Sequence, residues 1–389
     1  MPQKLRRFRV SLVALGLLVC IVALIPIAGA RLKTDKPEAP PPASTAVTAA
    51  LEPVYAVQAG LDGEIFPAFA NYASLQKPRD RKLATVTVRI LNSTRELLKN
   101  RISVQIPGWS DQEIQMIEVA PGESRTVTFA PTFLPRLFAN REITPATAVV
   151  TATDRSGRVT YNATVAVRLR AAEDMYWGPN FRFAPFIAAW VTPHDARVED
   201  ILSRAKEFMP GRRLPGYEPW KNRAAQVHST YEQARAIYRA LQQHGMSYVK
   251  SSTTFGQHLD VSERVRFPRE SLNRVSANCI DGVVMYASLL ENLGMDTVVV
   301  LVPGHAYVGV REAQKSDNYL YIETSITGRA TFENAVLSAS RGIGKHRPEK
   351  IIRIPIAKAR LDGIYPMPHS GRRGQSTARA ASPNHPAAD

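Results

Sequence analysis

Cysteine is scarce in this chain of 389 residues, which contains only two. Cys20 lies within an uncharged run near the N-terminus, so Cys279 stands alone in the rest of the sequence. A disulfide framework and a cysteine-based zinc site are therefore excluded for the body of the protein. The sequence also lacks a phosphate-binding glycine loop and any metal-like spacing of histidines, so we expect no cofactor and no metal.

Acidic residues are few relative to basic ones. There are 34 acidic and 50 basic residues, which gives a formal net charge of +16 at pH 7. This excess predicts contact with an anionic partner, such as nucleic acid, lipid head groups or acidic envelope polymers. Apolar residues make up 44% of the chain and aromatic residues 8%, which is enough for a sizeable core and excludes wholesale disorder.

The N-terminus has the pattern of an export segment. Its first nine residues carry four positive charges, and no charge occurs from Val10 to Ala30. The run ends in Ala28-Gly29-Ala30, which is typical of a cleavage site, so residues 1–30 are predicted to be a signal peptide cleaved after Ala30 or a retained membrane anchor. A lipobox at Cys20 is disfavoured, because the residue before the cysteine is not small.

Export sets the expected location and the expected partners. The protein is predicted to be bacterial and either anchored in the inner membrane through residues 10–30, with its body in the periplasm, or secreted. Outside the cytoplasm nucleic acid is not an expected partner. Lipid head groups and anionic envelope polymers then remain as partners for the basic body.

The first folded region is predicted to be rich in strands. Residues 31–52 are rich in proline and read as a spacer, and residues 53–172 are predicted to form an antiparallel β-sandwich of the immunoglobulin-like type. Its apolar residues alternate with polar ones, as expected for strands with one buried face. They include Val86, Val88, Ile90, Ile102, Val104 and Ile106. The sequence of this region shows no grouping of catalytic or ligand-binding residues, which favours a spacer or an adhesion module.

The second folded region, residues 175–366, changes to a helical period. A helix is predicted to start at Thr192-Pro193, and a second helix is predicted from about Asn222 to Gln243. Strands are expected after residue 296, and residues 367–389 are predicted to be a disordered basic tail. The fold class is therefore α+β, with a β-sandwich followed by a helix-plus-antiparallel-sheet domain.

Cys279 is predicted to lie at a helix N-terminus. The residues after it are apolar at helical spacing from Ile280 to Leu293, and Gly294 provides the stop. A helix N-terminus favours a thiolate over a thiol, as a nucleophile requires. The alternative is that Cys279 is a small apolar residue of the core.

Two predicted strands add a histidine and an acid. The sequences HAYVGV and NYLYIET read as strands joined by a loop from Arg311 to Asn318. If that hairpin is centred near residue 314, residue 309 faces 319, 307 faces 321 and His305 faces Glu323. Directly opposed side chains project from the same face of a sheet, so Glu323 can orient the imidazole of His305.

The order Cys279, His305, Glu323 on helix, strand and strand resembles the transglutaminase-like superfamily, which has a papain-like fold. The resemblance covers about Ala184 to Ala335, including ERVRFPRESLNRVSANCIDG, LVPGHAYVGV and YLYIETS. It implies that Cys279 is the nucleophile, His305 the general base and acid, and Glu323 the residue that orients the histidine. The third member in this family is usually aspartate. Glutamate either reaches from a slightly different backbone position or is structural.

The oxyanion hole is only partly assigned by the sequence. The amide of Cys279 is one natural donor, because helix N-termini direct amides at anions. Tyr248, Gln257 and Asn278 are the polar residues upstream that could supply a second donor. Each of them also has a plain interpretation as a surface or capping residue.

The resemblance implies an exported cysteine peptidase or amidase that acts on a peptide or protein through a thioester at Cys279. Two alternatives stay open. One is a cross-linking acyl transferase, in which an amine resolves the thioester. The other is a non-catalytic binding or scaffolding module of the cell envelope that keeps the fold without turnover.

Overall fold

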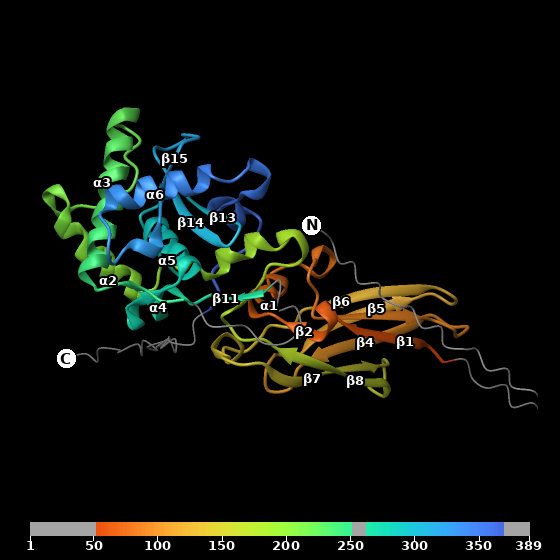
Figure 1. The fold of residues 1–389 in the computed structure, drawn as a ribbon. Helices are drawn as coiled ribbons and strands as arrows, with labels where there is room; N and C mark the ends of the chain where they lie inside the picture. The colour runs from red at the N-terminus through yellow and green to blue at the C-terminus, as the bar shows by residue number, and fades with distance from the viewer. Residues whose placement is uncertain (1–51, 251–261, 369–389) are drawn as a thin grey trace, which may run out of the picture. The chain divides into compact units, whose positions relative to one another are not determined.

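The computed structural model describes residues 52–250 and 262–368 (Figure 1). The chain divides into two units, Met1–Ala49 and Ala50–Asp389, and the first lies wholly outside the described residues. The predicted export segment and nearly all of the spacer and the tail therefore lie outside them as well. Helices and sheets both occur in the described part, which confirms the α+β class.

Two sheets occupy the first half of the described chain. A five-stranded sheet has the order β2-β8-β7-β4-β5 and is antiparallel except for the pair β2 and β8. A three-stranded antiparallel sheet has the order β1-β3-β6. The strands are β1 (Val54–Ala59), β2 (Glu64–Ile65), β3 (Val86–Leu91), β4 (Leu98–Gln105), β5 (Glu113–Val119), β6 (Ser124–Phe129), β7 (Thr144–Thr153) and β8 (Val159–Leu169), with helix α1 (Pro67–Ser74) after β2.

The alternating apolar residues of this region face inward, as predicted. All six are 0% exposed and belong to one apolar core that both sheets share; they are Val86, Val88, Ile90, Ile102, Val104 and Ile106. Burying a side chain of this size contributes roughly 1.5–3 kcal/mol. The alternation of apolar and polar residues therefore gives these strands one apolar face each, and that face is buried in the core.

A four-stranded antiparallel sheet organises the second half, with the order β15-β14-β13-β16. These strands are β13 (Thr297–Val302), β14 (His305–Arg311), β15 (Tyr319–Ile322) and β16 (Ile352–Pro355). On one face Val299 and Val308 join the core that contains helix α5 (Cys279–Asn292), and on the other Val298 and Val300 pack with helix α6 (Phe332–Gly344). Burial on both faces explains why β13 is apolar without alternation.

The further helices of this half are α2 (Ala196–Ala205), α3 (Arg223–Gln243), α4 (Pro268–Arg274) and α7 (Ile356–Leu361). Figure 1 shows α2 and α4 beside α5. The second predicted helix is confirmed, because Asn222 caps α3 by accepting the amide of Ala225 at 2.9 Å. The start predicted at Thr192 is wrong. Helix α2 begins at Ala196, since the carboxylate of Asp195 accepts the amide of Arg197 and is the true cap.

Two short strand pairs connect more distant segments. Strand β10 (Ser247–Tyr248) pairs in parallel with β12 (Ser276–Ala277), and β9 (Asp174–Tyr176) pairs antiparallel with β11 (Ser262–Arg264). Beside the second pair, Arg264 Nε lies 2.7 Å from Glu173 Oε2. The β9–β11 pair therefore ties the end of the strand-rich region to the segment ahead of the cysteine helix.

The last described residues are ordered against the body. Met367, the first residue of the predicted tail, is 2% exposed and donates its amide to the carbonyl of Ala189 at 2.9 Å. In the described ranges no helix has the length and apolar character needed to cross a bilayer.

Candidate active site

Cys279 is the first residue of helix α5, as predicted. Asn278 caps this helix: its side-chain oxygen accepts the amide of Asp281 at 2.7 Å, and the carboxylate of Asp281 accepts the amide of Asn278 at 3.3 Å. Asp281 is 0% exposed and pairs with Arg266, whose Nε lies 2.9 Å from Oδ2. This reciprocal cap fixes the end of the helix that presents the partly exposed Cys279.

His305 and Glu323 contact each other through their side chains. His305 begins strand β14, and Glu323 directly follows β15. The distance from His305 Nε2 to Glu323 Oε2 is 2.7 Å, and Oε1 of Glu323 accepts the amide of Ser325 at 2.9 Å. The carboxylate side chain is 7% exposed and the imidazole 27%, so the acid lies buried behind the ring.

The predicted register of the hairpin is wrong by two residues. Gly309 faces Tyr321 rather than residue 319, and Arg311 faces Tyr319. The turn is centred on Lys315, which has a φ of 61°, rather than on residue 314. A loop sequence does not fix which of its residues adopts the left-handed conformation, and that choice sets the register.

The contact between His305 and Glu323 forms despite this shift, because a shift of two residues leaves every side chain on the same face. Continuing the observed register places Glu323 opposite Tyr307, so Glu323 and His305 are diagonal neighbours. Diagonal Cβ atoms lie about 7–8 Å apart, against about 4.5–5.5 Å for opposed pairs. The extra methylene of glutamate gives the reach that this diagonal requires.

Two neighbours favour the protonated form of His305. The hydrogen bond with Cys279 has the largest effect, and the hydrogen bond with Glu323 has the next largest. Together they raise the pKa of His305 to about 10, although burial of the ring lowers it. Burial works against ionisation of Glu323, yet hydrogen bonds from His305 and Ser325 lower its pKa. Since Glu323 occupies Nε2, Nδ1 is the ring nitrogen left for the sulfur. The structure thus brings the three predicted residues together.

Thr324 links the acid to the cysteine helix, a role that the sequence analysis missed. Its hydroxyl donates to the carbonyl of Cys279 at 3.3 Å. A Cβ on Gly282 would lie 2.6 Å from Thr324 Oγ1, so only glycine permits this approach. A glycine in the first turn of an otherwise apolar helix was the available signal, because glycine inside a helix usually has a packing reason.

Of the proposed oxyanion donors, Tyr248 is exposed and lies near the start of the cysteine helix. Strand pairing sets it beside Ala277, two residues before Cys279. Burial raises the pKa of Tyr248, and the nearby charges of Cys279 and Glu323 raise it further. The side-chain oxygen of Asn278 is used in the helix cap, and Gln257 lies outside the described residues.

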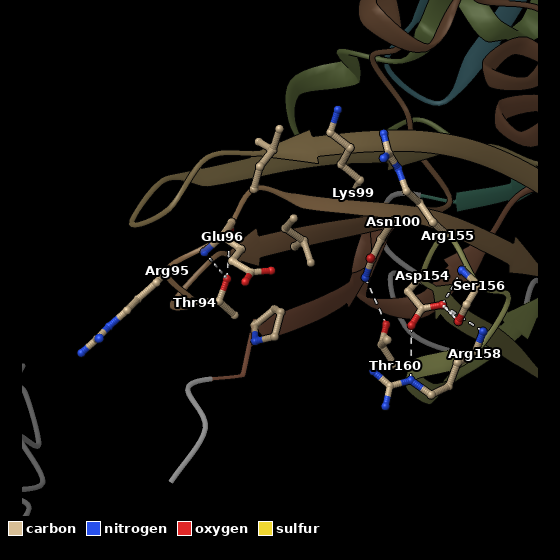
Figure 2. Close-up of a pocket in the computed structure, with 13 residues that line it drawn as sticks. Thr94, Arg95, Glu96, Lys99, Asn100, Asp154, Arg155, Ser156, Arg158 and Thr160 are labelled. Atoms are coloured by element: carbon tan, nitrogen blue, oxygen red, sulfur yellow. Dashed lines mark hydrogen bonds and ion pairs between the residues drawn. The ribbon is translucent and has the colours of Figure 1, made fainter. Parts of the chain in front are cut away.

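A separate hollow of about 730 Å³ lies in the strand-rich region (Figure 2). Its lining comes from the β3–β4 connection and the β7–β8 turn. Asn100 donates to Thr160 at 3.0 Å and Arg158 pairs with Asp154 across it. The lining contains no cysteine and no histidine, so it lacks the pair of residue types found at Cys279 and His305. Across residues 52–250 and 262–368 no cluster of histidine, cysteine and acidic residues could hold a metal ion.

Comparisons with known proteins give no family. No family model matches the chain, and no curated protein matches it. Among solved structures, a FixG-related protein from Vibrio parahaemolyticus is 15% identical with a TM-score of 0.20, over 31% of this chain and 98% of that one. Astrotactin-2, titled a conserved vertebrate-specific and perforin-like membrane protein involved in neuronal development, is 12% identical with a TM-score of 0.16, over 49% of this chain and 30% of that one. TM-scores this low carry no argument about fold or function.

Proposed function

We propose that this protein is an exported cysteine hydrolase of the transglutaminase-like type that cleaves peptide or amide bonds. In this proposal residues 53–172 form an immunoglobulin-like β-sandwich, and residues 175–366 form a papain-like domain that carries Cys279, His305 and Glu323. The observation that supports it most is the hydrogen-bonded row of sulfur, imidazole and carboxylate at the start of a capped helix.

The chemistry follows from the order of the three groups. The thiolate of Cys279 attacks a carbonyl carbon, and the helix N-terminus stabilises the oxyanion that forms. As the carbon–nitrogen bond breaks, His305 gives its proton to the leaving amine, and a thioester remains on Cys279. Water then attacks the thioester carbon and gives a proton to His305, and the carbon–sulfur bond breaks, which releases the carboxylic acid and restores the thiolate of Cys279. Glu323 keeps the ring oriented throughout.

The proposed setting is the bacterial cell envelope. An uncharged segment at residues 10–30 is long enough to act as an anchor or as a cleaved signal, and the basic body suits an anionic surface. A cross-linking transferase would use the same three residues, with an amine in place of water. A binding module would keep the fold and lose the reactive sulfur.

The reactivity of Cys279 separates an enzyme from a binding module. The experiment uses a Cys20→Ser variant, in which Cys279 is the only cysteine. We expect iodoacetamide at pH 6 to label this variant about tenfold faster than the double variant that also carries His305→Ala. A free thiol is roughly 0.3% ionised at this pH and reacts slowly, so a rate that depends on His305 would identify the imidazole as the group that activates the sulfur.

His194→Ala is the matched control, because His194 is an exposed histidine outside the site. It should leave the labelling rate unchanged. Slow labelling that does not depend on His305 would overturn the proposed function and favour the binding module. Peptide digestion followed by mass spectrometry places the label on Cys279.

A further inference from the structure

A groove leads away from the candidate active site along helix α3. Two adjoining cavities of about 490 and 570 Å³ share Gln242, Gly328 and Arg329 in their linings. The smaller one reaches Tyr248 and Ser325, and the larger one reaches Arg235 and Arg239. The shared residues make the two cavities one continuous depression.

The near end of this groove adjoins the candidate catalytic residues. Ser325 donates its amide to Glu323, and Tyr248 lies beside Ala277 in the strand pair that precedes Cys279. A small hollow that also contains Ser325 and Gly328 extends to Gly282, in the first turn of the cysteine helix. The groove therefore lies next to the segments that carry Glu323 and Cys279.

The walls of the groove are held in place by backbone contacts. The carbonyl of Ala330 accepts hydrogen bonds from Tyr238 at 3.1 Å and from Gln242 at 2.8 Å, both on α3. A Cβ on Gly328 would lie 2.5 Å from the carbonyl oxygen of Met246, so glycine allows the two segments to touch. A preformed site of this kind loses little freedom when a ligand binds.

Two arginines of the groove have charges that no acid neutralises. Arg235 pairs with Glu232 and Glu333. Arg239 and Arg329 are exposed, and within the described ranges neither forms an ion pair. Arg239 is held over the ring of Phe208, with its Cζ 5.3 Å from the ring centroid. Arginine binds carboxylates through two parallel hydrogen bonds, which suits it to recognise acidic groups.

We propose that this groove binds an acidic segment of the peptide substrate, with Arg239 and Arg329 as specificity residues that receive its carboxylates. The inference rests on the proposed function, because it names the substrate class of that site. The carboxylates come either from aspartate and glutamate side chains or from the peptide's C-terminus.

Binding to the full-length protein with Cys279→Ala tests this without turnover. The probes are fluorescein-labelled nonapeptide mixtures with randomised flanks and a central Glu-Glu or Gln-Gln pair, each with a free or amidated C-terminus. Fluorescence anisotropy at low salt should show Glu-Glu peptides binding about tenfold tighter than Gln-Gln peptides if side chains supply the charge. Preference for free over amidated peptides would instead assign the recognised carboxylate to the C-terminus.

The variants Arg239→Gln and Arg329→Gln, alone and combined, should remove this preference. Arg95→Gln is the matched control: Arg95 is also exposed, and in Figure 2 it projects away from the other labelled residues of the strand-rich region. The proposal is overturned if binding depends neither on the Glu-Glu pair nor on a free C-terminus, if no peptide binds, or if the preference survives both substitutions. Iodoacetamide labelling of Cys279 tests the proposed function separately, so the two failures are distinguishable.

Discussion

Replacing Glu323 by glutamine removes the charge behind His305 and keeps the shape of the side chain. The native carboxylate lies 2.7 Å from the imidazole and is only 7% exposed, so solvent screens the pair little. A hydrogen bond between charged groups contributes about 1.5–3 kcal/mol. Because 1.36 kcal/mol corresponds to one pH unit, Glu323→Gln should lower the pH at which the ring loses its proton by about one to two units.

The raised pKa of His305 also makes the stability of the fold depend on pH. The pKa of His305 is raised to about 10 in the folded protein. Its proton therefore stabilises the fold fully below the usual histidine pKa of about 6.5, and this contribution is lost as the pH rises through about 10. In Glu323→Gln this contribution should be smaller and its loss should be complete at a lower pH. Nuclear magnetic resonance of isotope-labelled histidine against pH measures the change directly, and hydrolysis should slow about ten- to hundredfold.

Glu323→Asp tests the diagonal geometry in the same assay. It retains the charge but shortens the side chain by roughly 1.5 Å, which is too much for a contact of 2.7 Å to persist without backbone movement. We expect it to titrate between the native protein and the glutamine variant, because the retained charge still lies near the ring while the direct hydrogen bond is lost. The exposed Glu349→Gln serves as control and should titrate like the native protein. If Glu323→Asp keeps the native titration and the native activity, the diagonal position does not require the length of glutamate. If Glu323→Gln titrates and reacts like the native protein, Glu323 does not orient His305.

Two further predictions concern the cysteine helix and the N-terminus. Gly282→Ala should lower the free energy of unfolding by about 1–3 kcal/mol in urea titration, because the added methyl group meets Thr324 at 2.6 Å. Gly344→Ala, where a Cβ meets nothing within 4 Å, should be neutral or stabilising by up to about 1 kcal/mol, and equal effects at the two sites would contradict the packing argument. The N-terminal sequence of membrane-bound protein should begin near Met1 if the first segment is an anchor, or at Arg31 if it is cleaved; a start well inside the body would fit neither.

Local patterns predicted much of the fold. The alternation at Val86, Val88 and Ile90 identified a strand and its buried face, because one side chain in two must avoid water. The apolar spacing after Cys279 located helix α5 and placed the sulfur at its first residue. Both depend on the nearest neighbours in the chain, which is why sequence alone was sufficient.

Features that depend on competition between alternatives were not predicted. Thr192 and Asp195 are both good capping residues, and in the structure it is the carboxylate of Asp195 that accepts the helix amide, from Arg197. The turn at Lys315 set a register that the loop composition left open. The groove along α3 combines segments that are distant in sequence, so no local pattern could have revealed its unpaired arginines.

The pairing of β9 with β11 limits how the protein can be shortened. Arg264 sits just upstream of the cysteine helix and is bonded to Glu173, and it also donates to the carbonyl of Arg141 at 2.7 Å. A truncation that starts at residue 175 would discard both acceptors. The strand-rich half therefore holds in place the segment that leads to the cysteine helix, and a shortened protein should retain it to keep this segment anchored.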